Sequence, residues 1–443
     1  MGLLDLDAIA RALAEAEPLP LTGTVVRATG LVVEAALPRV PVGTTCEIRA
    51  TDGSTVIAEV VGFFGQTARL MPLGDIHGIG EGCAVVPRAA ADRVPVGSAL
   101  LGRVVDASLR PVDGGPTPIL RARARLHAAP PPAMERRRVT RPVTLGLRAI
   151  DACLTVGEGQ RLAVLAGPGV GKSVLLGMLA RSADADVVVV GLIGERGREV
   201  RDFIERDLGS GLARAVVVVA TSDASPLHRV RAAMAATAVA EHFRGEGKRV
   251  LLLVDSLSRV AQAQREIGLA AGEPPTTKGY PPSSFAMLPR LVERAGNDAG
   301  PGSITAFYTV LAEGDDQTDP IADAAKATLD GHLVLSRKLA EGGHFPAVDV
   351  LASISRVMTD VVDAAHRDLA RQAREVLAAY REAADLVDVG AYAAGSNPRV
   401  DRALRCIAPL NAFLRQDPGE RSKLAETLGA LRRVLGVAEV PRA

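Results

Sequence analysis

Two different rhythms of apolar residues divide the chain. Between about residues 21 and 88, short valine-rich stretches such as GTVVRATGLVVEAAL and STVIAEVVGFFG are separated by glycine, proline and aspartate. Short apolar stretches at regular spacing, with turn-forming residues between them, are typical of antiparallel strands. This pattern predicts a small barrel or sandwich, which we place at residues 21–90.

From residue 147 the apolar residues form continuous runs instead. Six such runs alternate with helical segments, namely QRLAVLAG, DVVVVGLIG, ARAVVVVATS, KRVLLLVDS, GSITAFYTVL and GHLVLSR. Continuous rather than alternating runs indicate strands that are buried on both faces of a parallel sheet. We therefore expect an α/β domain at residues 146–358.

The remaining segments follow neither rhythm. Residues 91–145 are rich in proline and are expected to form a lead-in segment that runs extended over a surface, with the arginines at 136–138 solvated. Residues 359–443 hold three helical segments separated by breaks, which predicts a C-terminal helical domain. In residues 1–20, apolar side chains at positions 3, 6, 9 and 13 suit an amphipathic helix that docks either on this protein or on a partner.

The composition narrows the class of protein. A chain of 443 residues exceeds what one core usually serves, so two or three domains are expected. The 52 basic and 51 acidic residues nearly cancel and aromatic residues are few, so nucleic acid is not an expected partner. The 4 cysteines have no metal-binding spacing, and no secretory signal or membrane-spanning run is visible. We therefore expect a cytoplasmic compartment.

A glycine-rich segment, AGPGVGKS, lies between a predicted strand and a predicted helix. Glycines let backbone amides wrap a phosphate, and the helix N-terminus adds partial positive charge. Lys172 would bridge the β- and γ-phosphates, and the hydroxyl of Ser173 would ligate Mg²⁺. Ala166 replaces the usual first glycine, and Lys172 stands where a dinucleotide fingerprint needs glycine. The expected nucleotide-binding residues are Gly167, Pro168, Gly169, Val170, Gly171, Lys172, Ser173 and Val174.

A carboxylate follows the later apolar run KRVLLLVDS. Asp255 is expected at the carboxyl end of that strand, where ligands gather in parallel sheets. Together with Ser173 it would hold the magnesium ion that the nucleotide carries. A helix cap is the alternative role for a lone aspartate after a strand.

The run DVVVVGLIGERGREVRDF delivers Glu195 and Arg196 to the same edge of the sheet. Phosphoryl transfer to water gains most from an oriented nucleophile and from positive charge on the transferring group. Glu195 could orient the water and Arg196 could contact the γ-phosphate, while Arg198 and Glu199 brace the turn. The alternative is a surface cluster of salt bridges on the next helix.

Several long segments carry a resemblance to a known family. They are GLIGERGREV with the glycine loop, LLGRVVDASLRPVDG, REIGLAAGEPPTTKGYPPSSFAMLPRLVERAG and PAVDVLASIS. With them the chain resembles the ATPases of type III protein export, which are relatives of the rotary ATP synthase α and β subunits. The resemblance covers nearly the whole chain. It implies an α/β, RecA-like P-loop core with a parallel sheet, an N-terminal small β-barrel and a C-terminal helical domain.

The resemblance also implies a homohexameric ring with active sites between neighbouring subunits. Arg356 in SISRVM would be the arginine finger that reaches the γ-phosphate bound by the next subunit. Phe345 in HFPAVD would lie against the adenine, with a buried core position as the alternative. The implied substrate is ATP with Mg²⁺. The implied partners are stalk, regulator, export-gate, chaperone and substrate proteins at the cytoplasmic face of the inner membrane, to which the ring could attach peripherally.

The machine that such an ATPase serves has alternatives. The segments AGPGVGKSVLLGM and GAYAAGSNPRVDRAL favour flagellar export, whereas LMPLGDIHGI and VTLGLRAID also suit virulence injectisome ATPases. The segment at 265–296 argues against a rotary ATP synthase catalytic subunit. Balanced charge and few aromatic residues argue against an RNA-translocating hexameric ATPase. A non-catalytic nucleotide-binding ring subunit would not need Glu195.

Overall fold

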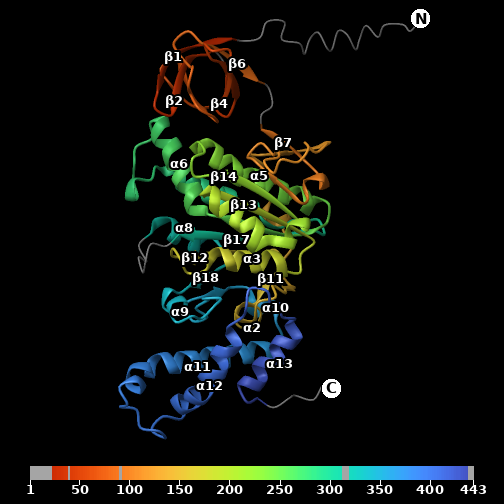
Figure 1. Ribbon diagram of the computed structural model, residues 1–443, viewed down its shortest axis with the longest axis vertical. Coiled ribbons are helices and arrows are strands. Elements are labelled where there is room, and N and C mark those ends of the chain that lie inside the picture. The colour runs from red at the N-terminus through yellow and green to blue at the C-terminus, as the bar shows by residue number, and fades with distance from the viewer. Residues whose placement is uncertain (1–21, 38–39, 89–91, 312–318, 438–443) are drawn as a thin grey trace, which may run out of the picture. The chain divides into compact units, whose positions relative to one another are not determined.

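The computed structural model describes residues 22–37, 40–88, 92–311 and 319–437. The chain forms two compact units, which are described separately (Figure 1). The first holds the residues up to Arg93, with short segments at 224–227 and 266–274, and the second holds the remainder. The amphipathic helix expected at residues 1–20 lies outside the described residues.

The first unit is built on a closed antiparallel barrel, as the alternating pattern predicts. Its core is formed by side chains that alternate along the strands, among them Val33, Ile48, Val60 and Leu70, none of which is exposed. The strands follow the order β1-β2-β5-β4-β3-β6 around the barrel. Their bounds are β1 Gly23–Thr29, β2 Val32–Ala36, β3 Thr45–Arg49, β4 Thr55–Phe64, β5 Thr67–Pro72 and β6 Ala84–Arg88.

The second unit is built on a nine-stranded sheet in the order β19-β18-β12-β17-β15-β13-β14-β8, with β16 paired to β17. Figure 1 labels β12, β13, β14, β17 and β18 of this sheet. All six apolar runs form strands of this sheet and pair in parallel. Five of them are buried on both faces, as their continuous apolar runs indicate, whereas β18 is only partly buried on one face. The bounds are β8 Arg103–Val105, β12 Arg161–Ala166, β13 Val187–Glu195, β14 Ala215–Thr221, β15 Arg249–Asp255, β16 Gly296–Asn297, β17 Ser303–Leu311, β18 Gly331–Leu335 and β19 Ile354–Ser355.

Helices connect the strands of this sheet. They are α2 Arg148–Cys153, α3 Lys172–Ser182, α4 Gly197–Asp202, α5 Pro226–Gly245, α6 Leu257–Ala271, α7 Pro282–Val292, α8 Pro320–Thr328 and α9 Arg337–Glu341. A π-helix at Phe203–Leu208 continues α4, and 3₁₀ turns lie at Ser98–Leu100, Ala133–Glu135, Gly209–Arg214 and Thr277–Gly279. Because β12, β15 and β13 lie near the middle of the sheet, the residues that follow them meet at its carboxyl edge.

The lead-in segment is more structured than its proline content suggests. It contributes β8 to the edge of the sheet beside β14, and it also forms β7 Arg93–Val96 paired with β9 Ala122–Arg125, and β10 Pro142–Val143 paired with β11 Val156–Gly157. Arg136 forms an ion pair with Glu293 at 3.1 Å. Arg137 donates a hydrogen bond to the Gly302 carbonyl at 2.8 Å. The expectation of a solvated side chain is therefore wrong for Arg136, which is partly buried, whereas Arg137 is exposed as expected.

The C-terminal part consists of helices, as expected: α10 Met358–Val361, α11 Ala364–Asp388, α12 Pro398–Leu414 and α13 Leu424–Val434. The three long helices are amphipathic, and their apolar faces share one core with α2 and the sheet. Side chains cap two of the helix starts: Asp363 accepts from the His366 amide, and Asn397 accepts from the Arg399 amide. In the described ranges, no helix is both long and apolar enough to cross a bilayer.

Candidate active site at the carboxyl edge of the sheet

The glycine loop joins the end of β12 to the start of α3. Gly169 and Gly171 have φ angles of 77° and 87°, a left-handed conformation that L side chains rarely adopt. A Cβ on Gly169 would meet open space, whereas a Cβ on Gly171 would lie 3.3 Å from the Phe345 ring. Ser173 and Val174, in the first turn of α3, are exposed. The loop therefore presents an accessible, unencumbered backbone at a helix N-terminus, which is the arrangement that binds phosphate.

Three charged side chains, Lys172, Glu195 and Asp255, meet beside this loop, and we call them the lysine–acid cluster. The Lys172 ammonium lies 2.6 Å from Asp255 Oδ1 and 3.2 Å from Glu195 Oε1. The Asp255 side chain is only 4% exposed. Lys172 begins α3 after the glycine loop that follows β12, while Glu195 and Asp255 end β13 and β15, so the sheet order brings them together as the sequence predicts.

Burial and charge act in opposite directions on this cluster. Burial lowers the pKa of Lys172, but the nearby Asp255 and Glu195 carboxylates outweigh it, so that pKa is raised and the amine stays protonated. Burial raises the pKa of Asp255, and Lys172 offsets only part of that rise. Removing the ammonium would therefore leave a buried carboxylate without a charge partner.

Two further side chains lie at this edge that the sequence analysis does not name. The Thr309 hydroxyl, near the end of β17, donates to Asp255 Oδ1 at 2.6 Å. Arg259, in the first turn of α6, passes beneath Gly194, whose φ is 75° and whose Cβ would lie 3.1 Å from the arginine side chain. The Arg259 Nε is buried and lacks a hydrogen-bond partner in the part of the chain that the structure describes. In the sequence, Thr309 could have been found as a polar residue near the carboxyl end of a predicted strand.

Arg196 lies at the rim rather than within the cluster. Its side chain is 80% exposed and approaches Glu199 at 3.7 Å. This is the salt-bridge geometry of the alternative hypothesis, so its contact with a phosphate stays a prediction.

The helix that follows is anchored to the glycine-loop helix. At the end of the π-helix, the main chain of Asp207 packs so closely on α3 that a Cβ at Gly177 would lie 2.6 Å from the Asp207 carbonyl oxygen. Only glycine fits at position 177, so the segment after Glu195 is held against the helix that carries Lys172.

Phe345 lies next to the glycine loop, on the segment between α9 and Pro346. Its side chain is 43% exposed, which disagrees with the alternative of a buried core position. Its ring faces Gly171. An exposed ring beside a phosphate-binding loop can stack on a base, although contact with adenine stays a prediction.

Arg356 lies apart from the lysine–acid cluster. It directly follows β19, its guanidinium donates to the Lys326 carbonyl at 3.1 Å, and its amide donates to the Asp330 carbonyl at 3.0 Å. Within the described ranges, no hydrogen bond or ion pair joins Arg356 to Lys172, Glu195 or Asp255. The finger role therefore stays a prediction that requires a second subunit.

The donor set at the cluster suits magnesium rather than a metal with an all-protein cage. In the described residues no group of three or more His, Cys, Asp or Glu side chains is placed to hold a metal ion. Mg²⁺ prefers oxygen ligands and typically takes one or two from protein and the rest from phosphates and water. The Asp255 carboxylate already holds a cationic group, and Ser173 supplies an accessible hydroxyl.

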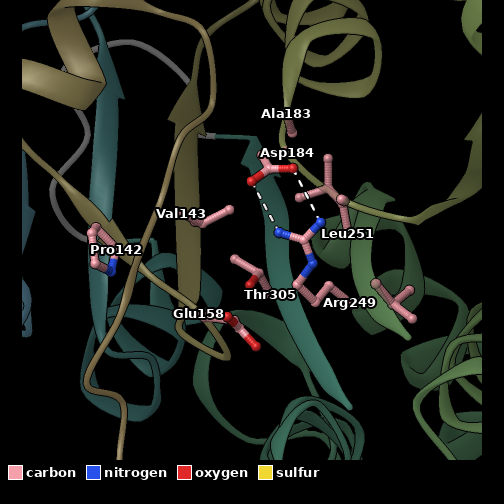
Figure 2. Close-up of a pocket in the computed structure, with 10 residues that line it drawn as sticks. Pro142, Val143, Glu158, Ala183, Asp184, Arg249, Leu251 and Thr305 are labelled. Carbon is pink, nitrogen blue, oxygen red and sulfur yellow. Dashed lines mark hydrogen bonds and ion pairs between the residues drawn. The ribbon is translucent and has the colours of Figure 1, made fainter. Parts of the chain in front are cut away.

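The opposite edge of the sheet has a small cavity with different chemistry (Figure 2). There the Arg249 guanidinium binds Asp184 at 2.9 Å and Asp186 at 3.1 Å. These hydrogen bonds raise the pKa of Arg249 further above its usual range. With its charge already satisfied, this edge offers no comparable site for a phosphate.

Family models match three consecutive parts of the chain. The ATP synthase alpha/beta family beta-barrel domain matches residues 25–88, and the nucleotide-binding domain of the same family matches residues 146–355. The T3SS EscN ATPase C-terminal domain matches residues 362–433.

Similar proteins cover almost the whole chain. The flagellum-specific ATP synthase of Salmonella typhimurium is 53% identical over 92% of each chain. A type 3 secretion system ATPase of Sinorhizobium fredii is 50% identical over 93% of this chain and 92% of its own. The assembled ATPase EscN of the enteropathogenic E. coli type III secretion system superposes with a TM-score of 0.88 at 41% identity, covering 93% of this chain and all of EscN. The chain therefore belongs to the ATP synthase α/β family and, within it, to the ATPases of type III protein export.

Proposed function

We propose that this ATPase works with Mg²⁺ in a homohexameric ring, with active sites between subunits, and that it powers flagellar protein export. The observation that carries the proposal is the lysine–acid cluster, in which Lys172, Glu195 and Asp255 converge beside the glycine loop. A phosphate-binding loop alone would serve a passive nucleotide binder. A second carboxylate next to the metal-binding one gives the site a group that can orient an attacking water.

Each residue of the site has a separate task in ATP hydrolysis. The amides of residues 167–173 bind the phosphates, and Lys172 leaves the carboxylates to neutralise charge on the β- and γ-phosphates. Ser173 and Asp255 hold Mg²⁺, which supplies further charge neutralisation. Glu195 orients a water whose oxygen bonds to the γ-phosphorus while the bond from that phosphorus to the β–γ bridging oxygen breaks. The products are ADP and phosphate.

The ring follows from the position of Arg356. It is exposed and makes no contact with the cluster of its own chain in the described residues, so it is free to reach the site of a neighbour. An arginine finger supplied in this way accelerates hydrolysis about 10³- to 10⁵-fold. The solved structures of assembled EscN support the ring, and one of them includes the central stalk EscO. A stalk protein is accordingly the first partner that we propose, followed by export-gate, regulator, chaperone and substrate proteins at the inner membrane.

Flagellar export is favoured by the names of the most similar proteins. Flagellum-specific relatives are 48–53% identical, the three at 51–53% being from Salmonella, Pseudomonas aeruginosa and Treponema pallidum, and type 3 secretion system ATPases are 47–50% identical. The margin is small, so an injectisome ATPase is the second candidate. Deletion of the gene in its own organism separates the two. Loss of hook and filament secretion supports the flagellar role, and loss of needle secretion with normal motility contradicts it.

ATP hydrolysis measured against protein concentration tests the catalytic proposal. Specific activity should rise with concentration as shared sites assemble, and it should vanish when Mg²⁺ is chelated. Glu195→Gln should lower kcat about 10²- to 10³-fold because the water loses its orienting carboxylate. The matched control is Glu205→Gln, since Glu205 is 58% exposed and forms a surface ion pair with Arg201. Equal activities of the two variants would contradict the proposal.

A further inference from the structure

A buried glutamine fixes the connector between α12 and α13, residues 415–423. Gln416 is 4% exposed. Its side-chain Nε2 donates to the Gly146 carbonyl at 2.8 Å and to the Glu420 carbonyl at 3.0 Å, and its Oε1 accepts from the Arg148 amide at 2.9 Å. Only this orientation of the side-chain amide satisfies two carbonyls and one N–H at once. The side chain therefore holds its own backbone at a defined place.

That backbone in turn holds the segment of Phe345. The main-chain amide of Gln416 donates to the Phe345 carbonyl at 2.9 Å. The Phe345 side chain is 43% exposed, so its own packing restrains it little. The hydrogen bond from Gln416 therefore adds a restraint on the Phe345 backbone to those from the buried neighbours His344 and Pro346.

Arg148 reinforces the same connector from the start of α2. Its Nε donates to the Phe413 carbonyl at 2.7 Å, and its two other nitrogens contact the Arg415 carbonyl and the Glu420 carboxylate. The end of α12 and the connector are thus bound to α2 on one side and to Phe345 on the other.

We propose that Gln416 is a positioning residue for the nucleotide base: it acts through Phe345 to set the affinity for ATP and the preference for adenine. The proposal rests on the proposed function, in which Phe345 stacks on the base. In the described part of the chain no hydrogen bond joins Gln416 to the lysine–acid cluster, so its loss should weaken base binding without slowing the chemical step.

The test is Gln416→Met, which keeps the side-chain volume and removes all three side-chain hydrogen bonds. KM for ATP should rise about five- to tenfold, equivalent to about 1 to 1.4 kcal/mol, while kcat at saturation stays within about twofold. The ratio of kcat/KM for ATP to that for GTP should fall. Equilibrium binding of the fluorescent nucleotide methylanthraniloyl-ATP should weaken by the same factor as KM rises.

A second variant separates positioning from general loss of stability. Leu431→Ala removes a fully buried side chain of α13 that makes no contact with Phe345 in the contacts described above. It should lower Tm of the helical part without changing KM or base preference. The two variants are compared at temperatures at which they are equally stable. If Leu431→Ala then changes KM and base preference as much as Gln416→Met does, Gln416 has only a structural role.

A double-mutant comparison shows whether Gln416 acts through Phe345. Phe345→Ala should itself raise KM and weaken base preference, and adding Gln416→Met to it should have little further effect. If the effects of the two substitutions on KM are additive, Gln416 does not act through Phe345. The proposal for Gln416 is then overturned, while the base site at Phe345 stands. If Phe345→Ala leaves both quantities unchanged, the base does not bind there and both proposals fail. If Phe345→Ala acts and Gln416→Met does not, the base site stands and the role of Gln416 is wrong.

Discussion

The lysine–acid cluster and the Arg356 segment show two opposite ways of holding charge. In the cluster, Lys172, Glu195 and Asp255 are 14%, 15% and 4% exposed and satisfy one another within one chain. Arg356 is exposed, and among the described residues its guanidinium donates to one backbone carbonyl, that of Lys326. Half of the proposed reaction centre is therefore complete in the monomer, and the other half requires a neighbour. This difference predicts that mutations in the two regions will have different effects on nucleotide binding and on turnover.

The largest effect is expected for Lys172→Met, which removes the cation of the cluster. Turnover should fall by more than about 10³-fold because the phosphates lose a neutralising charge that is buried in the site. Binding of methylanthraniloyl-ATP should also weaken. Steady-state hydrolysis and fluorescence titration measure the two. Lys423→Met is the control, because Lys423 is 86% exposed, and normal turnover in Lys172→Met would remove the cluster from the mechanism.

Arg356→Ala should match that loss of turnover without the loss of binding. We expect kcat to fall about 10³-fold while nucleotide affinity is kept and the free energy of unfolding changes by less than about 0.5 kcal/mol. Hydrolysis, titration and thermal denaturation test the three statements. Substantial residual turnover in the assembled variant would contradict the finger role.

Mixing two inactive variants tests whether Glu195 and Arg356 of neighbouring subunits form one site. Rings assembled from equal amounts of Arg356→Ala and Glu195→Gln chains contain interfaces in which the intact acid and the intact arginine meet. With random mixing these are about a quarter of all interfaces, so up to about a quarter of the activity should return. No recovery in mixed rings, with assembly verified by light scattering, would place both residues in the same subunit's site.

Thr309→Val is expected to have a moderate effect, because it removes one hydrogen bond to the buried Asp255 and keeps the shape of the side chain. Loss of about 1 kcal/mol should lower kcat/KM about five- to tenfold and raise the Mg²⁺ concentration needed for half-maximal activity. Thr305→Val is a matched control on the same strand, since the Thr305 hydroxyl accepts from the Gly159 amide toward the opposite end of β17. Equal behaviour of the two variants would argue against a role for Thr309 at the site.

The smallest effect is expected for Arg196→Ala. Its side chain is 80% exposed, so water and salt screen any contact with the γ-phosphate, and turnover should fall no more than about fivefold. Arg206→Ala is the control, because Arg206 is 81% exposed and also pairs with an acid on its own helical segment. If turnover falls more in Arg196→Ala than in Arg356→Ala, the expected order of these effects is wrong.

The sequence predicts well what is encoded within a short stretch. The six strands of the sheet follow from their continuous apolar runs, and the glycine loop, Asp255 and Glu195 each follow a predicted strand. Their convergence could be expected because carboxyl ends of parallel strands share one edge. The short, regularly spaced apolar stretches predicted an antiparallel barrel or sandwich, and the family resemblance implied the barrel that the structure has.

Features that depend on the order of the strands, or on contacts between segments that are far apart in the sequence, could not be predicted in this way. Thr309 reaches Asp255 because β17 lies beside β15, an adjacency that no local pattern encodes. Arg259 meets Gly194 only once α6 is placed. The sequence predicted a solvated linker for the lead-in segment for two reasons. Its high proline content gave no indication of the strand β8, and Glu293, the partner of Arg136, lies 157 residues further along the chain.

The close fit between Asp207 and Gly177 has a consequence for how the ATPase changes state during turnover. The strand that ends in Glu195 runs into a helical segment that is pressed directly onto α3, the helix that begins with Lys172. Movement of these parts relative to one another would require that close fit to open. Opening and closing of the site would fall to the surrounding parts: the base-facing aromatic ring, the connector behind it, and the guanidinium of the adjoining subunit.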